Sequence, residues 1–231
     1  GLPAGSYQVG FYDYDIGAYA AEYYAGAYRP DLATPLDITA EDRSGIDASL
    51  IPAAFISGVV TGSGPLEGIN VVAYYADIFV YVLGEPTDAT GTYRLPGLGP
   101  VAYKLLLVDP DGQYLNEWHE DKAGWETADP ISLTSGVTTT VNADMSAGGV
   151  VQGTVTADDS GTPLDGIAVT LYESGGEYVD NAVTNASGVY RIGTLAAGSY
   201  KLRFRDDEGS YLSEYYNDKP DLDSADLVAA T

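Results

Sequence analysis

One stretch occurs three times in the chain and constrains the fold more than any other feature. Its copies are Gly5–Arg29, Val101–Lys122 and Gly198–Lys219. The last two align at a constant offset, 200 − 103 = 97 residues, and share Tyr, Asp, Gly, Glu, aromatic and Lys positions. Self-similarity at a fixed period indicates a tandem array, in which one structural unit recurs along the chain.

The composition limits the kinds of partner that this array can have. The 231 residues carry a formal net charge of 10 − 34 = −24 and contain no cysteine. An acidic surface repels nucleic acid and anionic membranes, so neither is expected as a partner. Without cysteine there are no disulfides, thiolate metal sites or cysteine nucleophiles. The chain has no apolar run long enough to span a membrane as a helix, and its many tyrosines beside four lysines favour an extracellular protein.

The region around the second copy contains the largest number of sequence patterns that predict strands. Short apolar or alternating runs between Gly and Pro turns predict strands. These runs are Ile56–Val60, Asn70–Tyr75, Ile78–Leu83, Tyr93–Leu95, Tyr103–Val108 and Val137–Asn142. The run Ile78–Leu83 is continuously apolar, which predicts a strand that is buried on both faces or lies in an interface. No helix of ordinary length is predicted, and Tyr114–Trp125 is expected to form a long loop.

The repeat divides the chain into three modules, all predicted to be β-sandwiches. Residues 55–148 form a complete second module. Residues 1–54 form a first module without the early strands, and residues 149–231 form a third module without the counterpart of Val137–Met145. In the first module, Ile46–Leu50 matches Val141–Met145 and predicts a last strand.

Alternation in the first module places Tyr7, Val9 and Phe11 on one face of a strand, the expected core face. Tyr12 and Tyr14 then lie on the other face, which solvent or a neighbour must cover.

The spans Ile56–Tyr103 and Val151–Tyr200 share a pattern of I-x-G-x-V, P-L-x-G-I and T-[DN]-A-x-G-x-Y elements. This pattern resembles the carboxypeptidase-regulatory-like and collagen-adhesin B-type repeats of prokaryotic surface proteins. The resemblance implies Ig-like, prealbumin-like (transthyretin-like) sandwiches that serve as stalks, spacers or adhesive fibres, some of which bind carbohydrate. Some relatives form a Lys–Asn isopeptide from the first strand. The first strands here contain no lysine, and we expect Lys122 and Lys219 to pair with Glu117 and Glu214 instead.

Clustered carboxylates make calcium the metal to consider, because calcium takes six to eight oxygen ligands. The candidate ligands are Asp109, Asp111 and Asp129 in the second module, and Asp206, Asp207 and Asp226 in the third. The alternative is that the Asp-rich stretches only form and cap turns. No EF-hand pattern accompanies them.

Aromatic side chains of the repeated stretch could stack on sugar rings. They are Tyr114, Trp118 and Trp125 in the second module, and Tyr211, Tyr215 and Tyr216 in the third. Because the Glu-aromatic pair recurs in every copy, we favour packing of the loop onto its own sandwich or an adjoining module. Asn185-Ala186-Ser187 matches the N-glycosylation acceptor pattern but occupies the turn position of Asp88-Ala89-Thr90.

No catalytic function is expected, because the single histidine, His119, is not repeated and no nucleophile–base set accompanies it. The leading hypothesis is a structural subunit of an extracellular fibre or stalk, in which strands pass between copies of the chain or adjoining repeats. A donor strand within Thr39–Leu50 would join the third module of a neighbour. The alternatives are a carbohydrate- or protein-binding adhesin module and an accessory domain of an enzyme.

Overall fold

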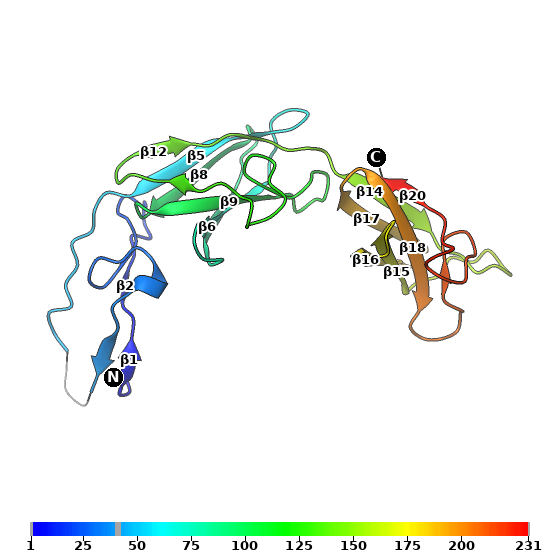
Figure 1. Cartoon of the computed structure of the whole chain (residues 1–231), viewed down its shortest axis with the longest axis horizontal. Helices are drawn as coiled ribbons and strands as arrows, with labels where there is room; N and C mark the ends of the chain where they lie inside the picture. Colours follow the sequence, from blue (N-terminus) through cyan, green and yellow to red (C-terminus); the bar gives the residue numbers. More distant parts are fainter. Residues whose placement is uncertain (1, 40–42, 231) are drawn as a thin grey trace. The chain divides into compact units, whose positions relative to one another are not determined.

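The computed structural model describes residues 2–39 and 43–230, and it is nearly all-β (Figure 1). Over these residues the only helical element is the 3-10 turn η1 (Pro30–Leu32). The expected all-β class is therefore confirmed. The chain forms two compact units. Unit 1 comprises Gly1–Pro110 and Asn116–Met145, and unit 2 comprises Asp111–Leu115 and Ser146–Thr231.

The second module is a sandwich of two sheets within unit 1. One sheet has the order β10-β9-β6-β7, with β11 also paired to β9; the other has the order β12-β5-β13, with β8 also paired to β5. The strands are β5 (Ala54–Thr61), β6 (Asn70–Tyr75), β7 (Tyr81–Pro86), β8 (Thr92–Leu98), β9 (Ala102–Val108), β10 (Glu117–Trp118), β11 (Ile131–Ser132), β12 (Thr138–Thr140) and β13 (Ala143–Asp144).

Alternating side chains build the core of this module. Every second residue of β5 and β6 is buried, because successive side chains of a strand face opposite sides of its sheet. Ile56, Val71, Leu95 and Leu105 are buried in this core at 1% exposure or less.

The third module repeats the arrangement in unit 2. One sheet has the order β16-β15-β18-β19, with β20 also paired to β18, and β14 pairs with β17. The strands are β14 (Gly149–Thr154), β15 (Ile167–Glu173), β16 (Tyr178–Val183), β17 (Val189–Leu195), β18 (Gly198–Asp206), β19 (Glu214–Tyr215) and β20 (Val228–Ala230). Val169, Leu171, Ile192 and Leu202 are buried between the two sheets. The expected tandem sandwich fold is thus confirmed.

The first module forms two small antiparallel pairs, β1 with β4 and β2 with β3. Their bounds are Gly5–Tyr7 (β1), Gly10–Phe11 (β2), Glu22–Tyr23 (β3) and Leu36–Ile38 (β4). It joins the second module in unit 1, where the backbone N–H of Ala21 donates to the Gly97 carbonyl at 3.1 Å. The prediction of a strand at Ile46–Leu50 is wrong, because these residues have no strand partner within the described part of the chain.

The third predicted strand of the second module begins later than its apolar run. β7 starts at Tyr81, while Ile78–Val80 form a turn in which the Tyr75 N–H donates to the Val80 carbonyl. Stacking of Phe79 on Tyr74, with ring centroids 4.9 Å apart, accompanies this turn. The first alternative, burial on both faces, is wrong, since Phe79 is 63% exposed and β7 lies at a sheet edge. The second alternative, a strand in an interface, stays a prediction.

A tyrosine at the start of the repeated stretch plays the same part in every module. Tyr7, Tyr103 and Tyr200 each donate their hydroxyl to the carbonyl four residues earlier, at 2.9, 3.2 and 2.7 Å. The bond ties the strand to the turn that precedes it. Hydroxyl-to-backbone bonds of this kind fix strand corners in other sandwiches.

The residue after this tyrosine holds the following loop in place. Gln8, Lys104 and Lys201 donate to the carbonyls of Pro30, Trp125 and Leu222 at 3.0, 2.7 and 2.8 Å. We call this contact the clamp.

Each loop also adds a two-residue strand, β3, β10 or β19, to the sheet. It then turns through two residues with positive φ, which are Ala25 and Gly26, Glu120 and Asp121, and Asn217 and Asp218.

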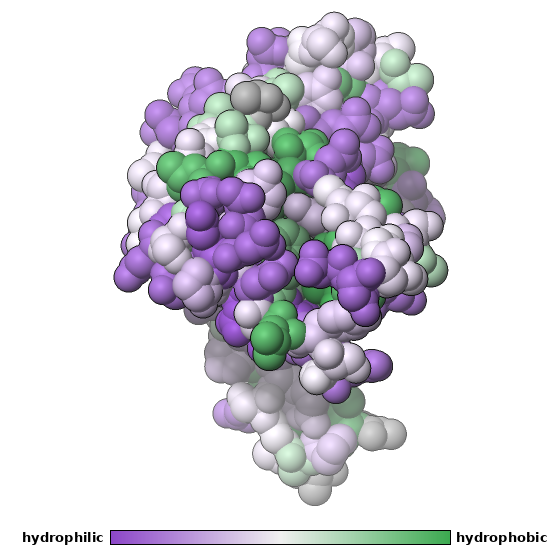
Figure 2. All heavy atoms as spheres, turned by 90° about the vertical axis from the view of Figure 1, so that its right-hand side faces the viewer, coloured by the Kyte–Doolittle hydropathy of each residue, from purple (hydrophilic) through white to green (hydrophobic). Residues whose placement is uncertain are grey.

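The surface reflects the composition. Figure 2 shows a face on which hydrophilic residues predominate and hydrophobic residues form separate patches. Among the described residues, the structure contains no helix with the length and hydropathy needed to span a membrane.

Candidate functional site

The two tryptophans predicted for sugar stacking pack against their own module. Trp118 is 6% exposed, with its ring centroid 5.3 Å from that of Tyr74 and 6.2 Å from that of Phe79. Trp125 lies 6.0 Å from Phe79, and the Lys104 ammonium sits 4.2 Å above its ring. These rings therefore attach the loop to the sheet, which is the structural role favoured from the sequence.

The other predicted aromatic residues all belong to unit 2. Tyr114 belongs to unit 2, where it forms a β-bridge with Ala147, and so lies in a different unit from Trp118 and Trp125. Tyr215 lies in β19, with Arg203 above its ring at 6.0 Å. Tyr216 is exposed. Tyr211, also exposed, lines a cavity of about 350 Å³ beside Asp206 and Glu214. A shared binding role for these residues stays a prediction.

Asp206 caps a turn in the structure. Its carboxylate accepts the backbone N–H groups of Glu208, Ser210 and Tyr211 at 2.7–3.0 Å. The bond from Glu208 and then those from Tyr211 and Ser210 lower the pKa of Asp206 despite some desolvation. Asp13 in the first module accepts the N–H groups of Ala18 and Tyr19 in the same way.

The remaining candidate calcium ligands make ion pairs or fall into different units. Asp207 pairs with Arg205 at 2.7 Å. Asp109 and Asp129 lie in unit 1, whereas Asp111 lies in unit 2. Across residues 2–39 and 43–230, no three His, Cys, Asp or Glu side chains are grouped so as to hold a metal ion. Calcium binding stays a prediction.

The two loop lysines have other partners than expected. Lys122 Nζ lies 3.4 Å from Asp129, and Lys219 Nζ lies 3.7 Å from Asp226. The expected partners, Glu117 and Glu214, instead belong to the two-residue strands β10 and β19, whose pairing with the sheet fixes where these side chains lie.

The asparagine of the glycosylation pattern also caps a turn. Asn185 Oδ1 accepts the N–H groups of Ser187 and Val189, as Asp88 Oδ1 accepts those of Thr90 and Thr92. The match to the acceptor pattern is thereby accounted for by the turn, and glycosylation stays a prediction.

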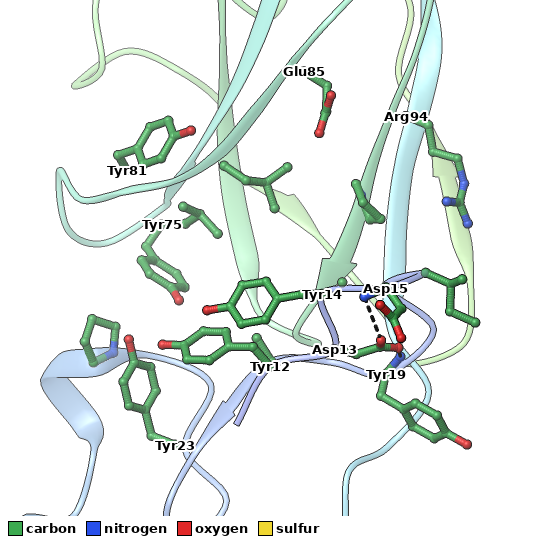
Figure 3. Close-up of a pocket in the computed structure, with 18 of the residues that line it drawn as sticks. Tyr12, Asp13, Tyr14, Asp15, Tyr19, Tyr23, Tyr75, Tyr81, Glu85 and Arg94 are labelled. Carbon is green, nitrogen blue, oxygen red and sulfur yellow. Dashed lines mark hydrogen bonds between the residues drawn. The ribbon is translucent and has the colours of Figure 1, made fainter. Parts of the chain in front are cut away.

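A cavity that sequence reasoning did not identify lies in unit 1, between the first module and strands β7 and β8. Its volume is about 610 Å³. We call it the tyrosine pocket after the six tyrosines in its lining, Tyr12, Tyr14, Tyr19, Tyr23, Tyr75 and Tyr81. In Figure 3, the hydroxyl groups of Tyr12, Tyr14, Tyr23 and Tyr75 point toward one another.

These rings are ordered by contacts with one another. Tyr12 stacks on Tyr14 with centroids 5.5 Å apart, and Tyr23 meets Tyr12 edge-on at 6.4 Å. A hydrogen bond with Tyr23, together with desolvation, raises the pKa of Tyr12 to about 12. Burial, followed by the charge of Tyr12, raises the pKa of Tyr75 to about 12. Both phenols therefore stay protonated at neutral pH and can donate hydrogen bonds.

Comparison of the copies gives the signal that could have revealed this pocket. Tyr12 and Tyr14 stand where the second module has Val108 and Pro110, and where the third has Arg205 and Asp207. The position of Tyr75 is Glu173 in the third module. The sandwich template therefore does not require tyrosine at these positions, in contrast to the tyrosines that bond to the preceding turn.

A second feature is the outer edge of the first strand in the second and third modules, β5 and β14. In the second module, β5 has β8 on one side and the parallel strands β12 and β13 on the other. We call residues 137–145, which contain β12 and β13, the closing segment. A Cβ atom at Gly58 would overlap the Val141 carbonyl oxygen of this segment. The buried Tyr93 hydroxyl donates to the same oxygen at 2.7 Å.

The third module keeps the residues that accommodate such a segment. Gly153 and Tyr190 are the counterparts of Gly58 and Tyr93. A Cβ atom at Gly153 would lie 2.9 Å from the Tyr190 hydroxyl oxygen. Within the described part of the chain, β14 pairs only with β17. The edge of β14 that corresponds to the closing side of β5 is therefore open over these residues.

Several solved structures resemble the chain at low identity. A streptococcal ancillary pilin is 18% identical, covering 99% of this chain and 72% of that one, with a TM-score of 0.40. The minor pilin GBS52 of Streptococcus agalactiae is 14% identical, covering 77% and 90%, with a TM-score of 0.36. The Bacillus anthracis TIE protein is 17% identical over 73% of this chain, with a TM-score of 0.32, and the match spans only 31% of that protein's chain.

The match to a protein family lies within the third module. No curated protein matches the chain. Residues 150–213 match the carboxypeptidase regulatory-like domain. For that part of the chain, the match confirms the resemblance to carboxypeptidase regulatory-like domains that the repeated pattern indicated.

Proposed function

We propose that this chain is a segment of an extracellular fibre or stalk, built from tandem β-sandwich modules that are joined by a shared strand. The three modules repeat the tyrosine bond, the clamp and the two-residue loop strand. The feature that recurs is thus the set of hydrogen bonds that ties the repeated stretch to its own module. The single histidine, His119, does not recur, and we propose a non-enzymatic role.

The observation that carries the proposal is the open edge of β14 beside Gly153 and Tyr190. In the second module, the corresponding glycine and tyrosine receive the closing segment. An unpaired strand edge with a complementary groove is a template for a further strand. We infer that β14 accepts a strand parallel to itself, as β5 accepts β12 and β13.

The segment that fits this edge best within the chain is Ile46–Leu50. Aligned with the closing segment, Ile46 replaces Val141, Asp47 replaces Asn142 and Leu50 replaces Met145. Asn142 Oδ1 accepts the Val59 N–H at 3.0 Å, and a carboxylate at Asp47 could accept the counterpart N–H. Residues 43–50 have no strand partner of their own in the structure. Of the expected donor span Thr39–Leu50, residues 40–42 lie outside the described residues.

Donation of this segment to the third module of a second copy would give head-to-tail assembly. Such a contact joins two different surfaces, so it can extend without closing. A strand from an adjoining repeat of a longer chain would satisfy the same edge. In both cases the module acts as a link in a linear array at the cell surface.

The test uses the full chain and a synthetic peptide that reproduces residues 137–145. We expect the peptide to bind, with Gly153→Val abolishing binding because the new side chain fills the space beside Tyr190. The matched control is Val183→Thr on β16, the edge strand of the other sheet, which should bind normally. A second peptide covering residues 43–50 should compete. A monodisperse monomer at high concentration that binds neither peptide would overturn the proposal.

A further inference from the structure

We propose that the tyrosine pocket binds a neutral oligosaccharide. This inference goes beyond the structural role, because it assigns a ligand to a cavity that the tandem fold does not require. Its volume of about 610 Å³ falls within the range of roughly 300–1,000 Å³ that is typical of small-ligand sites. It lies within a single compact unit, so the first and second modules build it together.

The aromatic surface is the first argument. Tyr14 is 87% exposed, Tyr81 is 59% exposed, and Tyr12 and Tyr19 are also exposed. Large aromatic rings that are exposed to solvent around one cavity indicate a ligand-binding surface. Tyrosine supplies flat contact area at a low cost in conformational entropy, and its hydroxyl supplies a polar handle. A pyranose ring presents C–H faces that stack on such rings, and hydroxyl groups that exchange hydrogen bonds with phenols.

The polar groups of the pocket suit the hydroxyl groups of a sugar. The phenols of Tyr12 and Tyr75 remain protonated at neutral pH and point toward the centre of the tyrosine group (Figure 3). Glu85 and Arg94 also line the cavity. Neither has an ion pair among residues 2–39 and 43–230, and the Arg94 guanidinium lies instead over the Phe55 ring at 3.9 Å. Both can therefore bond to a ligand.

Charge decides between neutral and acidic sugars. Asp13, Asp15 and Glu85 line the pocket with Arg94 as the one cation among its lining residues, in a chain of net charge −24. Anionic glycans would be repelled, because unpaired like charges in a cleft oppose binding. The Asp13 carboxylate already accepts the N–H groups of Asp15, Ala18 and Tyr19, and so holds the loop that carries Tyr12 and Tyr14.

Comparison with the third module favours an oligosaccharide over an extended peptide that pairs with the free edge of β7. The third module has an equivalent edge strand, β16, so an open edge belongs to the template. Tyr12, Tyr14 and Tyr75 are the additions, since their counterparts elsewhere are Val, Pro, Arg, Asp or Glu. A peptide adding to β7 would depend mainly on its backbone, whereas stacking on sugar depends on these added rings.

The test is binding of the full chain to an array of neutral and anionic glycans, followed by titration calorimetry with the neutral glycan retained most strongly. We expect Tyr14→Ala and Tyr81→Ala each to weaken binding by about tenfold, the loss of one stacking contact. Tyr14→Phe keeps the ring and should stay within about threefold of the unmodified chain. Tyr178→Ala, at the counterpart of Tyr81 on β16, is the matched control and should not change binding.

Because Tyr14 and Tyr81 are exposed, these variants are expected to fold, which thermal unfolding checks. The proposal is overturned if no neutral glycan is retained, if anionic glycans bind more tightly, or if Tyr14→Ala and Tyr81→Ala bind as well as Tyr178→Ala. Binding of an extended peptide at this site, with no glycan bound, would assign the pocket to strand addition instead.

Discussion

At the scale of single residues, the tyrosine that opens each repeated stretch stands out because it has the same hydrogen bond in all three modules. The Tyr200 hydroxyl donates to the Ala196 carbonyl at 2.7 Å. A nearby tyrosine, Tyr211, belongs to the loop and lines a cavity, and it is 45% exposed whereas Tyr200 is 7% exposed. Comparison of the two tyrosines separates the effect of losing this hydrogen bond from the effect of removing a phenol hydroxyl alone.

We expect Tyr200→Phe to destabilise unit 2 by about 1 kcal/mol, because the part-buried bond to the Ala196 carbonyl is lost. Tyr211→Phe should change the free energy of unfolding by less than about 0.5 kcal/mol. Urea unfolding of both variants provides the measurement. Equal stability of the two variants would show that the tyrosine bond does not contribute to the fold.

Glu117 gives the chain a pH-dependent stability. Burial raises the pKa of Glu117 to about 7, and the charges of Asp121 and Asp144 add to the effect. The folded state therefore holds this proton more tightly than the unfolded state, whose pKa is near 4.5. The resulting stabilisation is complete below pH 4.5 and is lost as the pH rises through 7.

We expect unit 1 to lose on the order of 1–2 kcal/mol between pH 5 and pH 8 through this group. Glu117→Gln, which is neutral throughout, should remove that part of the pH dependence. Thermal unfolding of both proteins across this range is the measurement. An unchanged pH profile in the variant would mean that other acidic groups cause the dependence.

At the scale of elements, the closing segment of the second module depends on the absence of a side chain at Gly58. A Cβ atom there would collide with the Val141 carbonyl, and the two parallel strands β12 and β13 would have to move away from β5. Gly64 lies in the turn after β5 and has open space around its Cβ position. It is therefore a matched glycine without the steric requirement.

We expect Gly58→Ala to destabilise unit 1 by about 2–4 kcal/mol, since backbone must shift to relieve the overlap. Gly64→Ala should be neutral within about 0.5 kcal/mol. Chemical denaturation, with hydrogen exchange at β12 and β13, measures both the stability and the place of the damage. Normal protection of β12 in Gly58→Ala would contradict the steric argument.

At the scale of the whole molecule, the net charge of −24 opposes association between copies. Salt screens this repulsion, and the Debye length falls from about 20 Å at 0.02 M to about 4 Å at 0.5 M. We expect head-to-tail association, measured by sedimentation velocity at fixed protein concentration, to strengthen severalfold over this range. Binding of the peptide that reproduces residues 137–145 should change less, because this peptide has one acidic residue. Association that weakens with salt would contradict a strand-mediated contact between acidic copies.

The sequence by itself determined the repeat and most of the strands. β6 has the predicted bounds, Asn70–Tyr75, because a short apolar run that follows a Gly and Pro turn is a local property of the sequence. The repeat also indicated the structural role of Trp118, since a motif present in every copy belongs to the scaffold. The tertiary structure alone decided which distant residues meet. It paired Lys122 with Asp129, left Ile46–Leu50 without a strand partner, and gathered Tyr12, Tyr14, Tyr75 and Tyr81 around one cavity. The physical reason is that periodicity fixes which way a side chain faces, whereas long-range contacts depend on how separate segments pack together.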